Sequence, residues 1–279
     1  MNMLFKVMGV SKQSFHQYHN RMLIRLQEEA NLIALIEDIR KDHPTMGCRD
    51  MYFKLAPETI GRDAFEELCR MYGFMSQRVR HPRLTTDSRG VKPFDNLVKD
   101  LVLTGADQLW VSDITYFSLE NRFYYLTFIL DAYTKRILGH STSKSLFVED
   151  TSLAAFTMAL KTRKKDKMPG LIFHSDRGGQ YYAKAFLKLT DEYAIQNSMC
   201  KYPWENPYAE RINGVIKNNY LIHWEIKTYL GLLQSVDRAV ELYNTDKPHK
   251  SLGRLTPVEF EKTIFAAEQP SSGSNVAQE

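Results

Sequence analysis

The sequence has 279 residues, of which 43% are hydrophobic and 25% are charged, with a formal net charge of +4 and a pI of about 8.8. This length predicts one large or two modest domains, and the composition is ordinary for a globular protein with a proper core. The mildly basic balance permits nucleic-acid binding but does not establish it.

Cysteine spacing and the lack of long apolar segments exclude further classes of protein. Cys48, Cys69 and Cys200 show no Cys-x-x-Cys spacing, which argues against a disulfide framework and against the common zinc sites. No apolar stretch approaches membrane-spanning length, and residues 1–10 do not read as a signal peptide. We therefore expect a soluble protein of the cytoplasm that makes no membrane contact.

Residues 1–75 have the pattern of a small all-α region. A short helix is expected over residues 4–20, with a break and an N-cap at Ser11. A second helix is expected over residues 22–41, because apolar positions recur there at helical spacing until His43-Pro44 ends the run.

Two shorter helices are expected over residues 48–56 and 62–72. Two short helices around a tight turn indicate a helix-turn-helix, although a small bundle that binds nothing would have the same spacing. In a DNA-binding unit, Arg62 and Arg70 would carry the binding face.

Residues 76–94 form a basic, proline-interrupted linker. Its charged residues are Arg78, Arg80, Arg83, Arg89 and Lys92 on the basic side and Asp87 on the acidic side. Such a segment suits contact with a DNA backbone, where it would release counterions, and we expect Arg78, Arg80 and Arg83 to bind DNA. The alternative is an ordinary solvated linker.

Residues 95–265 have the pattern of an α/β domain, and residues 266–279 that of a disordered tail. In chain order we expect strands over 108–119, 123–131 and 136–143, a helix over 148–161, a strand over 171–174, a helix over 183–193, a strand over 195–199, and helices around Glu210 and over 229–243. This order is that of an RNase H-like fold with a mixed five-stranded sheet.

Three acidic residues lie at a predicted strand, at the end of a second strand and near the start of a helix. Asp113 shares a strand face with Leu109 and Val111, and a carboxylate in a buried row must be paired or must hold a metal. Asp176 ends the later apolar run, directly before a glycine-rich loop, and Glu210 lies early in a helix that a proline opens.

Each acid has a simpler interpretation when taken alone. Asp113 could be hydrogen-bonded by backbone donors, and Asp176 could form a turn. Glu210 could simply be stabilised by the helix dipole, because it lies in the first turn. Taken together, the three could converge on a two-metal site, and oxygen ligands favour Mg²⁺, with Mn²⁺ as a substitute.

The helix that carries Glu210 has one polar face. Asn206, Glu210, Asn213 and Lys217 recur on it at helical spacing. Lys217 could reach a phosphate near the metals or could be a solvated lysine. Asn206 could bind DNA or could cap the helix.

Three blocks of the sequence resemble the acidic blocks of the DDE integrase core, in the form found in bacterial insertion-sequence transposases with two reading frames, OrfA and OrfB. The blocks are Trp110-x-x-Asp113-Ile114-Thr115-Tyr116, His174-Ser175-Asp176-x-Gly178-x-Gln180-Tyr181 and Asn206-x-x-x-Glu210. The resemblance covers about Leu4 to Phe260 and is closest to the OrfB product. The spacing from Asp176 to Glu210 is shorter than is usual in the family, and the shortening falls in residues 201–205.

This resemblance implies a DNA transposase that cleaves DNA and transfers strands at the ends of a mobile element. It implies a polynucleotidyl transferase with two ions, Mg²⁺ or Mn²⁺, held by the catalytic residues Asp113, Asp176 and Glu210. The implied partners are terminal inverted repeats, target DNA, further copies of the chain, and an OrfA protein or OrfA fusion. A bacterial, nucleoid-associated location follows from the same resemblance.

Two alternatives belong to the same analysis. One is a DNA-binding regulator with an inert core, which predicts the loss of at least one acid, whereas all three are present. The other is a catalytic half that stays inactive until it is fused to an upstream OrfA protein. A retroviral-type integrase would need a zinc module, and the N-terminal histidines and cysteines lack its Cys-x-x-Cys half.

Overall fold

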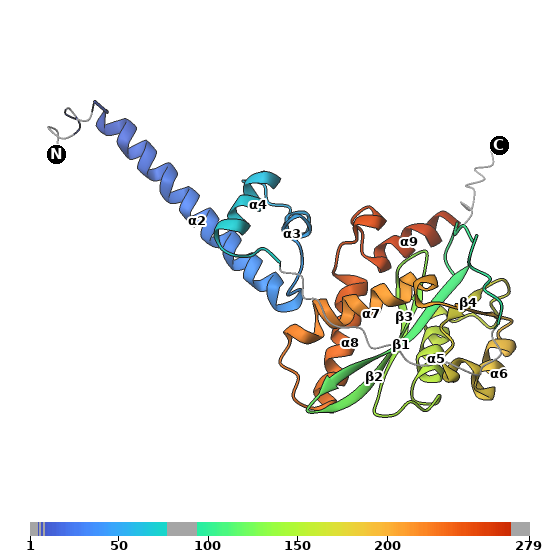
Figure 1. The fold of residues 1–279 in the computed structure, drawn as a ribbon. Helices are drawn as coiled ribbons and strands as arrows, with labels where there is room; N and C mark the ends of the chain where they lie inside the picture. The colour runs from blue at the N-terminus through green and yellow to red at the C-terminus, as the bar shows by residue number, and fades with distance from the viewer. Residues whose placement is uncertain (1–4, 6, 8, 77–93, 269–279) are drawn as a thin grey trace, which may run out of the picture. The chain divides into compact units, whose positions relative to one another are not determined.

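The computed structural model describes Phe5, Val7, residues 9–76 and residues 94–268, and it divides into two compact units, Met1–Gln77 and Arg78–Glu279 (Figure 1). The predicted linker residues Arg78, Arg80 and Arg83 lie outside the described residues, as does most of the predicted tail. No helix in the described part of the chain is long and apolar enough to cross a membrane.

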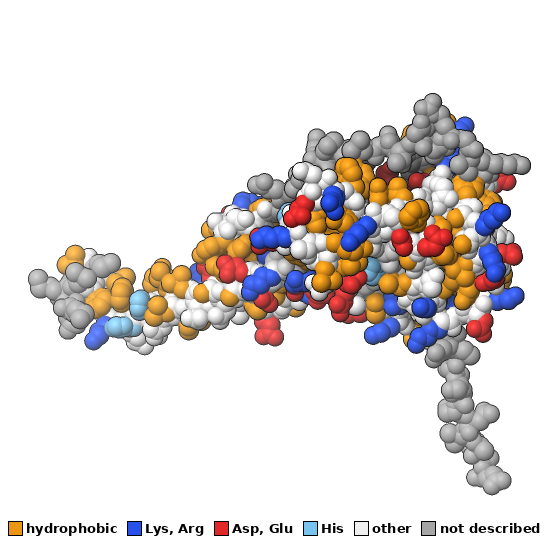
Figure 2. Space-filling model, turned by 90° about the horizontal axis from the view of Figure 1, so that it is seen from below, with side chains coloured by type: hydrophobic (Ala, Val, Ile, Leu, Met, Phe, Trp, Pro, Cys, Tyr) orange, Lys and Arg blue, Asp and Glu red, His pale blue; other side chains and the backbone are white. Residues whose placement is uncertain are grey.

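The first unit begins with one long helix, α2 (Lys12–Asp42), where we expected two. The expected N-cap is confirmed, because the hydroxyl of Ser11 accepts a hydrogen bond from the Ser14 amide at 3.0 Å. Residues 12–42 contain no glycine or proline, so nothing interrupts the hydrogen-bond ladder after residue 20. Exposed apolar side chains lie along the N-terminal half of α2 (Figure 2).

The end of α2 packs on two short helices, α3 (Cys48–Leu55) and α4 (Arg62–Met71), as the apolar spacing predicted. Their shared core is small and consists of Leu32, Ile36, Ile39, Met46, Cys48, Met51, Phe65, Leu68 and Cys69. Tyr72 is exposed, and its hydroxyl donates to Glu29 of α2 at 2.6 Å.

The second unit is built on a mixed five-stranded sheet. Its strands are β1 (Leu109–Leu119), β2 (Arg122–Asp131), β3 (Ile137–Ser143), β4 (Ile172–Ser175) and β5 (Gln196–Met199), in the order β3-β2-β1-β4-β5. The first three strands form an antiparallel meander, and β4 and β5 run parallel to β1. The predicted RNase H-like α/β fold is therefore confirmed.

Helices cover both faces of this sheet (Figure 1). On one face, Leu109 and Val111 pack beneath α7 (Pro207–Asn219) and α8 (Tyr229–Thr245). On the other face, Trp110 and Phe173 pack beneath α5 (Ser152–Arg163) and α6 (Lys184–Glu192). The alternation of side chains along β1 thus feeds two separate cores.

Gly139 of β3 allows α5 to approach the sheet closely. A Cβ atom at this position would overlap the backbone of Ala155 and Ala159 in α5. Only glycine permits this packing of helix on strand without a shift of one of them.

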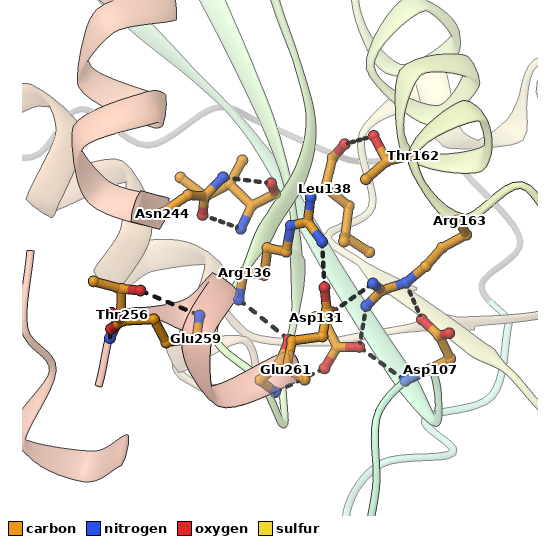
Figure 3. A network of polar contacts seen from close by, with 12 residues as sticks. Asp107, Asp131, Arg136, Leu138, Thr162, Arg163, Asn244, Thr256, Glu259 and Glu261 are labelled. Carbon is orange, nitrogen blue, oxygen red and sulfur yellow. Dashed lines mark hydrogen bonds and ion pairs between the residues drawn. The ribbon is translucent and has the colours of Figure 1, made fainter. Parts of the chain in front are cut away.

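A buried network of ions fastens the start of β1 to α5 and to α9 (Pro257–Glu268), a helix that we did not predict (Figure 3). The guanidinium of Arg163 donates to the carboxylates of Asp107, Asp131 and Glu261, and its distance to Asp131 is 3.0 Å. Asp131 also accepts hydrogen bonds from the amides of Asp107, Tyr133 and Thr134. Arg136 forms a second ion pair with Glu261.

We predict that Arg163→Met lowers the free energy of unfolding by about 3–5 kcal/mol, because it leaves buried carboxylates without their cation. The Arg163 side chain is 3% exposed, whereas Lys165, which also pairs with Asp107, is 50% exposed. The matched control Lys165→Met should cost less than about 1 kcal/mol. Urea unfolding followed by circular dichroism measures both, and similar losses for the two variants would contradict this account.

Candidate active site

Asp113 lies on β1, in the row of side chains that faces α7. Asn213 of α7 donates its side-chain amide to the Asp113 carboxylate at 2.8 Å. Burial, together with the neighbouring charges of Asp176 and Glu210, raises the pKa of Asp113 to about 7, although hydrogen bonds from Ile114 and Asn213 oppose the rise. The Asp113 side chain therefore keeps its proton up to a pH far above the usual pKa of an aspartic acid.

Asp176 follows the end of β4, which pairs with β1 in parallel so that Val111 lies opposite His174. Continuing this register brings Asp176 beside Asp113. The amide of Gly178 donates to Asp176 at 2.9 Å, and a Cβ at residue 178 would stand only 2.9 Å from the same oxygen. Burial raises the pKa of Asp176 as well.

Glu210 lies in the first turn of α7, where Pro207 occupies a position that needs no backbone donor. Its charge contributes to the raised pKa of Asp113, so Asp113 interacts electrostatically with both of the other predicted acids. Among the described side chains, however, no three His, Cys, Asp or Glu residues are already gathered closely enough to hold a metal ion.

Lys217 lies on the face of α7 that carries Glu210. Its ammonium donates to the hydroxyl of Thr115 at 3.1 Å and stands 5.0 Å from the ring centroid of Tyr116. Burial lowers the pKa of Lys217, and the charge of Asp113 opposes that change. A half-buried cation therefore lies near Asp113. Asp113, Asp176 and Glu210 are called the acidic group below.

Asn206 has a different place from the one we expected. It is 4% exposed, makes no side-chain cap, and donates its amide to the Ser112 carbonyl at 3.0 Å. The hydroxyl of Ser112 in turn meets that of Tyr181 at 2.9 Å. A buried side chain cannot reach DNA in this structure, so Asn206 ties the start of α7 to β1, one residue before Asp113.

His174 is buried, with 1% of its surface exposed. Its Nδ1 atom meets the Ser198 hydroxyl at 2.9 Å, and burial lowers its pKa to about 4 despite the opposing backbone and charge of Glu205. A cavity of about 390 Å³ lies beside it, lined also by Val111 and Asn206. His174, Val111 and Asn206 precede Asp176, Asp113 and Glu210 in the chain by two, two and four positions.

Arg62 and Arg70, the candidate DNA contacts of the first unit, are both exposed on α4. Each pairs with an acid of its own helix, Arg62 with Asp63 at 2.8 Å and Arg70 with Glu67. They thus remain accessible but share their charge with a neighbour. On the face drawn in Figure 2, basic side chains are dispersed among acidic and apolar ones.

The acidic group suits divalent metal ions in its chemistry. The carboxylates supply oxygen only, and the buried side-chain oxygens of Asn206 and Asn213 have no hydrogen-bond partner. Burial also makes the negative charges of Asp113 and Asp176 costly without a cation. Oxygen donors of this kind fit Mg²⁺ or Mn²⁺.

Comparison with known proteins gives the family. Models of the integrase core domain match residues 104–202 and 193–257, which include all three acids. A putative transposase for the insertion sequence element IS986/IS6110, from Mycobacterium tuberculosis (strain CDC 1551 / Oshkosh), is 30% identical over 283 residues, covering 95% of this chain and 100% of that protein. The chain belongs to the insertion-sequence transposases.

Two further proteins are similar to this transposase. The insertion element IS600 uncharacterized 31 kDa protein of Shigella sonnei is 29% identical over 265 residues, covering 91% of this chain and 96% of that protein. Among solved structures, the HTLV-2 integrase catalytic core domain in complex with magnesium is 19% identical, covers 56% of this chain and 96% of that chain, and has a TM-score of 0.44.

We predict that the metal-free transposase loses stability as pH rises from about 4 to about 7. Burial raises the folded-state pKa of Asp113 to about 7, above the unfolded value of about 3.9, so the folded protein holds this proton longer than the unfolded chain does. Asp113→Asn has no proton to lose there, and it should be more stable than the wild type above pH 7.

Urea unfolding in EDTA across this pH range measures the effect. Asp191→Asn, which alters an exposed acid of α6, serves as the matched control and should follow the wild type. Identical pH slopes for the wild type and Asp113→Asn would contradict the prediction.

Proposed function

We propose that this transposase cleaves DNA and joins strands at the ends of its mobile element, with Asp113, Asp176 and Glu210 as the catalytic metal ligands. The observation that supports the proposal is the coupling of three acids, from two strands and a helix, at one edge of the sheet. A regulator would have no reason to keep these charges together at the expense of stability.

The proposed cofactor is a pair of Mg²⁺ ions, or Mn²⁺ in their place. When bound, such ions activate the attacking oxygen and stabilise the leaving oxygen in phosphoryl transfer. The chain's own residues prepare the site. Asn213 donates to the Asp113 carboxylate, and the amide of Gly178 donates to that of Asp176, so hydrogen bonds orient both side chains.

The remaining work of the protein is to position DNA and to neutralise its charge. We propose that Lys217, whose ammonium donates to the hydroxyl of Thr115, meets a phosphate that reaches the acids. The attacking group is water in cleavage and a DNA 3′-hydroxyl in strand transfer, so no side chain forms a covalent intermediate.

The first unit and the basic linker are proposed to hold the DNA outside the catalytic site. Arg62 and Arg70 are exposed on α4, and Arg78, Arg80 and Arg83 follow them in the chain. In this layout, residues 1–75 bind DNA, residues 76–94 connect, and residues 95–265 catalyse. We further propose that the chain acts as a multimer on terminal inverted repeats, as an OrfB product alone or fused to OrfA.

We predict that strand transfer of the element's own ends requires Mg²⁺ or Mn²⁺ and is abolished by EDTA. Asp113→Asn, Asp176→Asn and Glu210→Gln should each lower the rate by more than about 100-fold, because each removes a metal ligand. Asp191→Asn should keep wild-type activity. Joining that survives EDTA or all three substitutions would overturn the proposal; if the chain alone is inactive, the same test is run on an OrfA fusion.

We predict that Lys217 contributes one phosphate contact. Lys217→Gln should weaken DNA binding and reduce the slope of log affinity against log salt by about 1, whereas Lys217→Arg should keep the slope. Lys188→Gln removes an exposed lysine of α6 and is the matched control. Fluorescence anisotropy over a salt series measures these slopes. An unchanged slope in Lys217→Gln would contradict the phosphate contact and leave Lys217 with only its structural hydrogen bond to Thr115.

A further inference from the structure

The loop between β5 and α7 presents two aromatic rings to solvent. Tyr202 and Trp204 are 41% and 69% exposed, and their rings stack with centroids 4.4 Å apart and planes inclined by 5°. The other tryptophans lie differently: Trp110 is fully buried, and Trp224 packs against Tyr220 and Arg238. Trp204 is therefore the tryptophan whose ring is most available to a partner.

Local hydrogen bonds give this exposed pair a defined shape. The Glu205 carboxylate accepts hydrogen bonds from the amides of Lys201 and Tyr202, the latter at 2.9 Å. The Glu205 amide donates back to the Tyr202 carbonyl at 3.0 Å. Glu205 thus closes the turn that holds the two rings parallel.

Both ends of the loop are fastened next to the candidate acids. The amide of Cys200 donates to the Ser175 carbonyl at 3.0 Å, one residue before Asp176. At the other end, Asn206 donates to the Ser112 carbonyl at 3.0 Å, one residue before Asp113. The loop that carries the rings therefore begins and ends beside residues that directly precede Asp176 and Asp113.

The chemistry of the pair suits a nucleobase. A flat aromatic face in solvent stacks on any base, and Lys201, whose ammonium stands 5.2 Å from the ring centroid of Tyr202, adds a positive charge for the adjoining phosphate. A base inside a duplex already has both faces covered, so a gain is expected only for an unpaired base.

We propose that Trp204 and Tyr202 form a stacking platform for an unpaired base of the DNA strand whose phosphate lies at Asp113, Asp176 and Glu210. The inference rests on the proposed function and deepens it, because it assigns the platform to strand separation beside the reacting phosphate. The platform lies in residues 201–205, the segment in which this sequence departs from the family's usual spacing.

The test uses the full-length chain and two DNA probes that carry the element's terminal sequence. One probe is fully paired, and the other has unpaired bases beside the cleavage position, including one 2-aminopurine whose fluorescence is quenched by stacking. Binding is measured in Ca²⁺ by anisotropy, together with 2-aminopurine emission, for the wild type, Trp204→Ala and Trp204→Phe.

The wild type should quench 2-aminopurine and prefer the unpaired probe. Trp204→Ala should lose the quenching and bind the unpaired probe about 5- to 150-fold more weakly, with little change for the paired probe. Trp204→Phe keeps an aromatic face and should retain most of the preference. Because Trp204 is exposed, all three proteins should unfold at the same urea concentration.

Several results would overturn the platform. Absent quenching in the wild type, or equal losses on both probes in Trp204→Ala, would exclude base stacking. A change of oligomeric state in Trp204→Ala with unchanged probe preference would assign the rings to contact with a second copy. Asp176→Asn should still quench 2-aminopurine while losing strand transfer, so failure of the proposed catalytic function is distinguished from failure of the platform.

Discussion

The burial of Asp113 beside two further carboxylates is the constraint on which the catalytic unit depends. Asp113, Asp176 and Glu210 come from a central strand, the end of its parallel neighbour and the first turn of a helix. Burial and the nearby charges raise the pKa of Asp113 to about 7, so the metal-free fold holds this arrangement at a cost in stability. The proposed metal ions would relieve that cost.

The rest of the unit supplies the rigidity that such a site requires. Apolar cores on both faces of the sheet fix β1, and the buried ions around Arg163 fasten the start of the same strand to α5 and α9. Asn206 joins α7 to the backbone beside Asp113. Each acid is thus positioned by an element that packing holds in place, in keeping with catalysis by preorganised charge.

The strands of the sheet, and the positions of Asp113 and Asp176 relative to them, could be predicted from the sequence because both depend on local patterns. The alternation around Asp113, and the apolar run before Asp176, mark strands whatever their neighbours are. The resemblance to the insertion-sequence transposases added the prediction that the three acids act together as one catalytic site. Membership of that family is confirmed. The OrfB assignment and the catalytic roles stay predictions.

Features that depend on distant contacts could not be predicted. Arg163 and Glu261 are far apart in sequence, and nothing local to either residue indicates that they meet in the interior. Asn206 has the position of a helix cap, yet its side-chain amide donates to the Ser112 carbonyl on β1. The stacking of Tyr202 on Trp204 likewise depends on the turn that Glu205 closes, which the spacing of the residues does not reveal.

The central claim is that the three acids hold a divalent ion against the scissile phosphate. The most direct measurement is cleavage of end DNA in which the leaving 3′-oxygen is replaced by sulfur. Mg²⁺ coordinates sulfur poorly and Mn²⁺ does so better, so the account predicts cleavage of this substrate in Mn²⁺ but not in Mg²⁺, and of the oxygen substrate in both. Equal cleavage of the sulfur substrate in the two metals, or cleavage in EDTA, would contradict the claim.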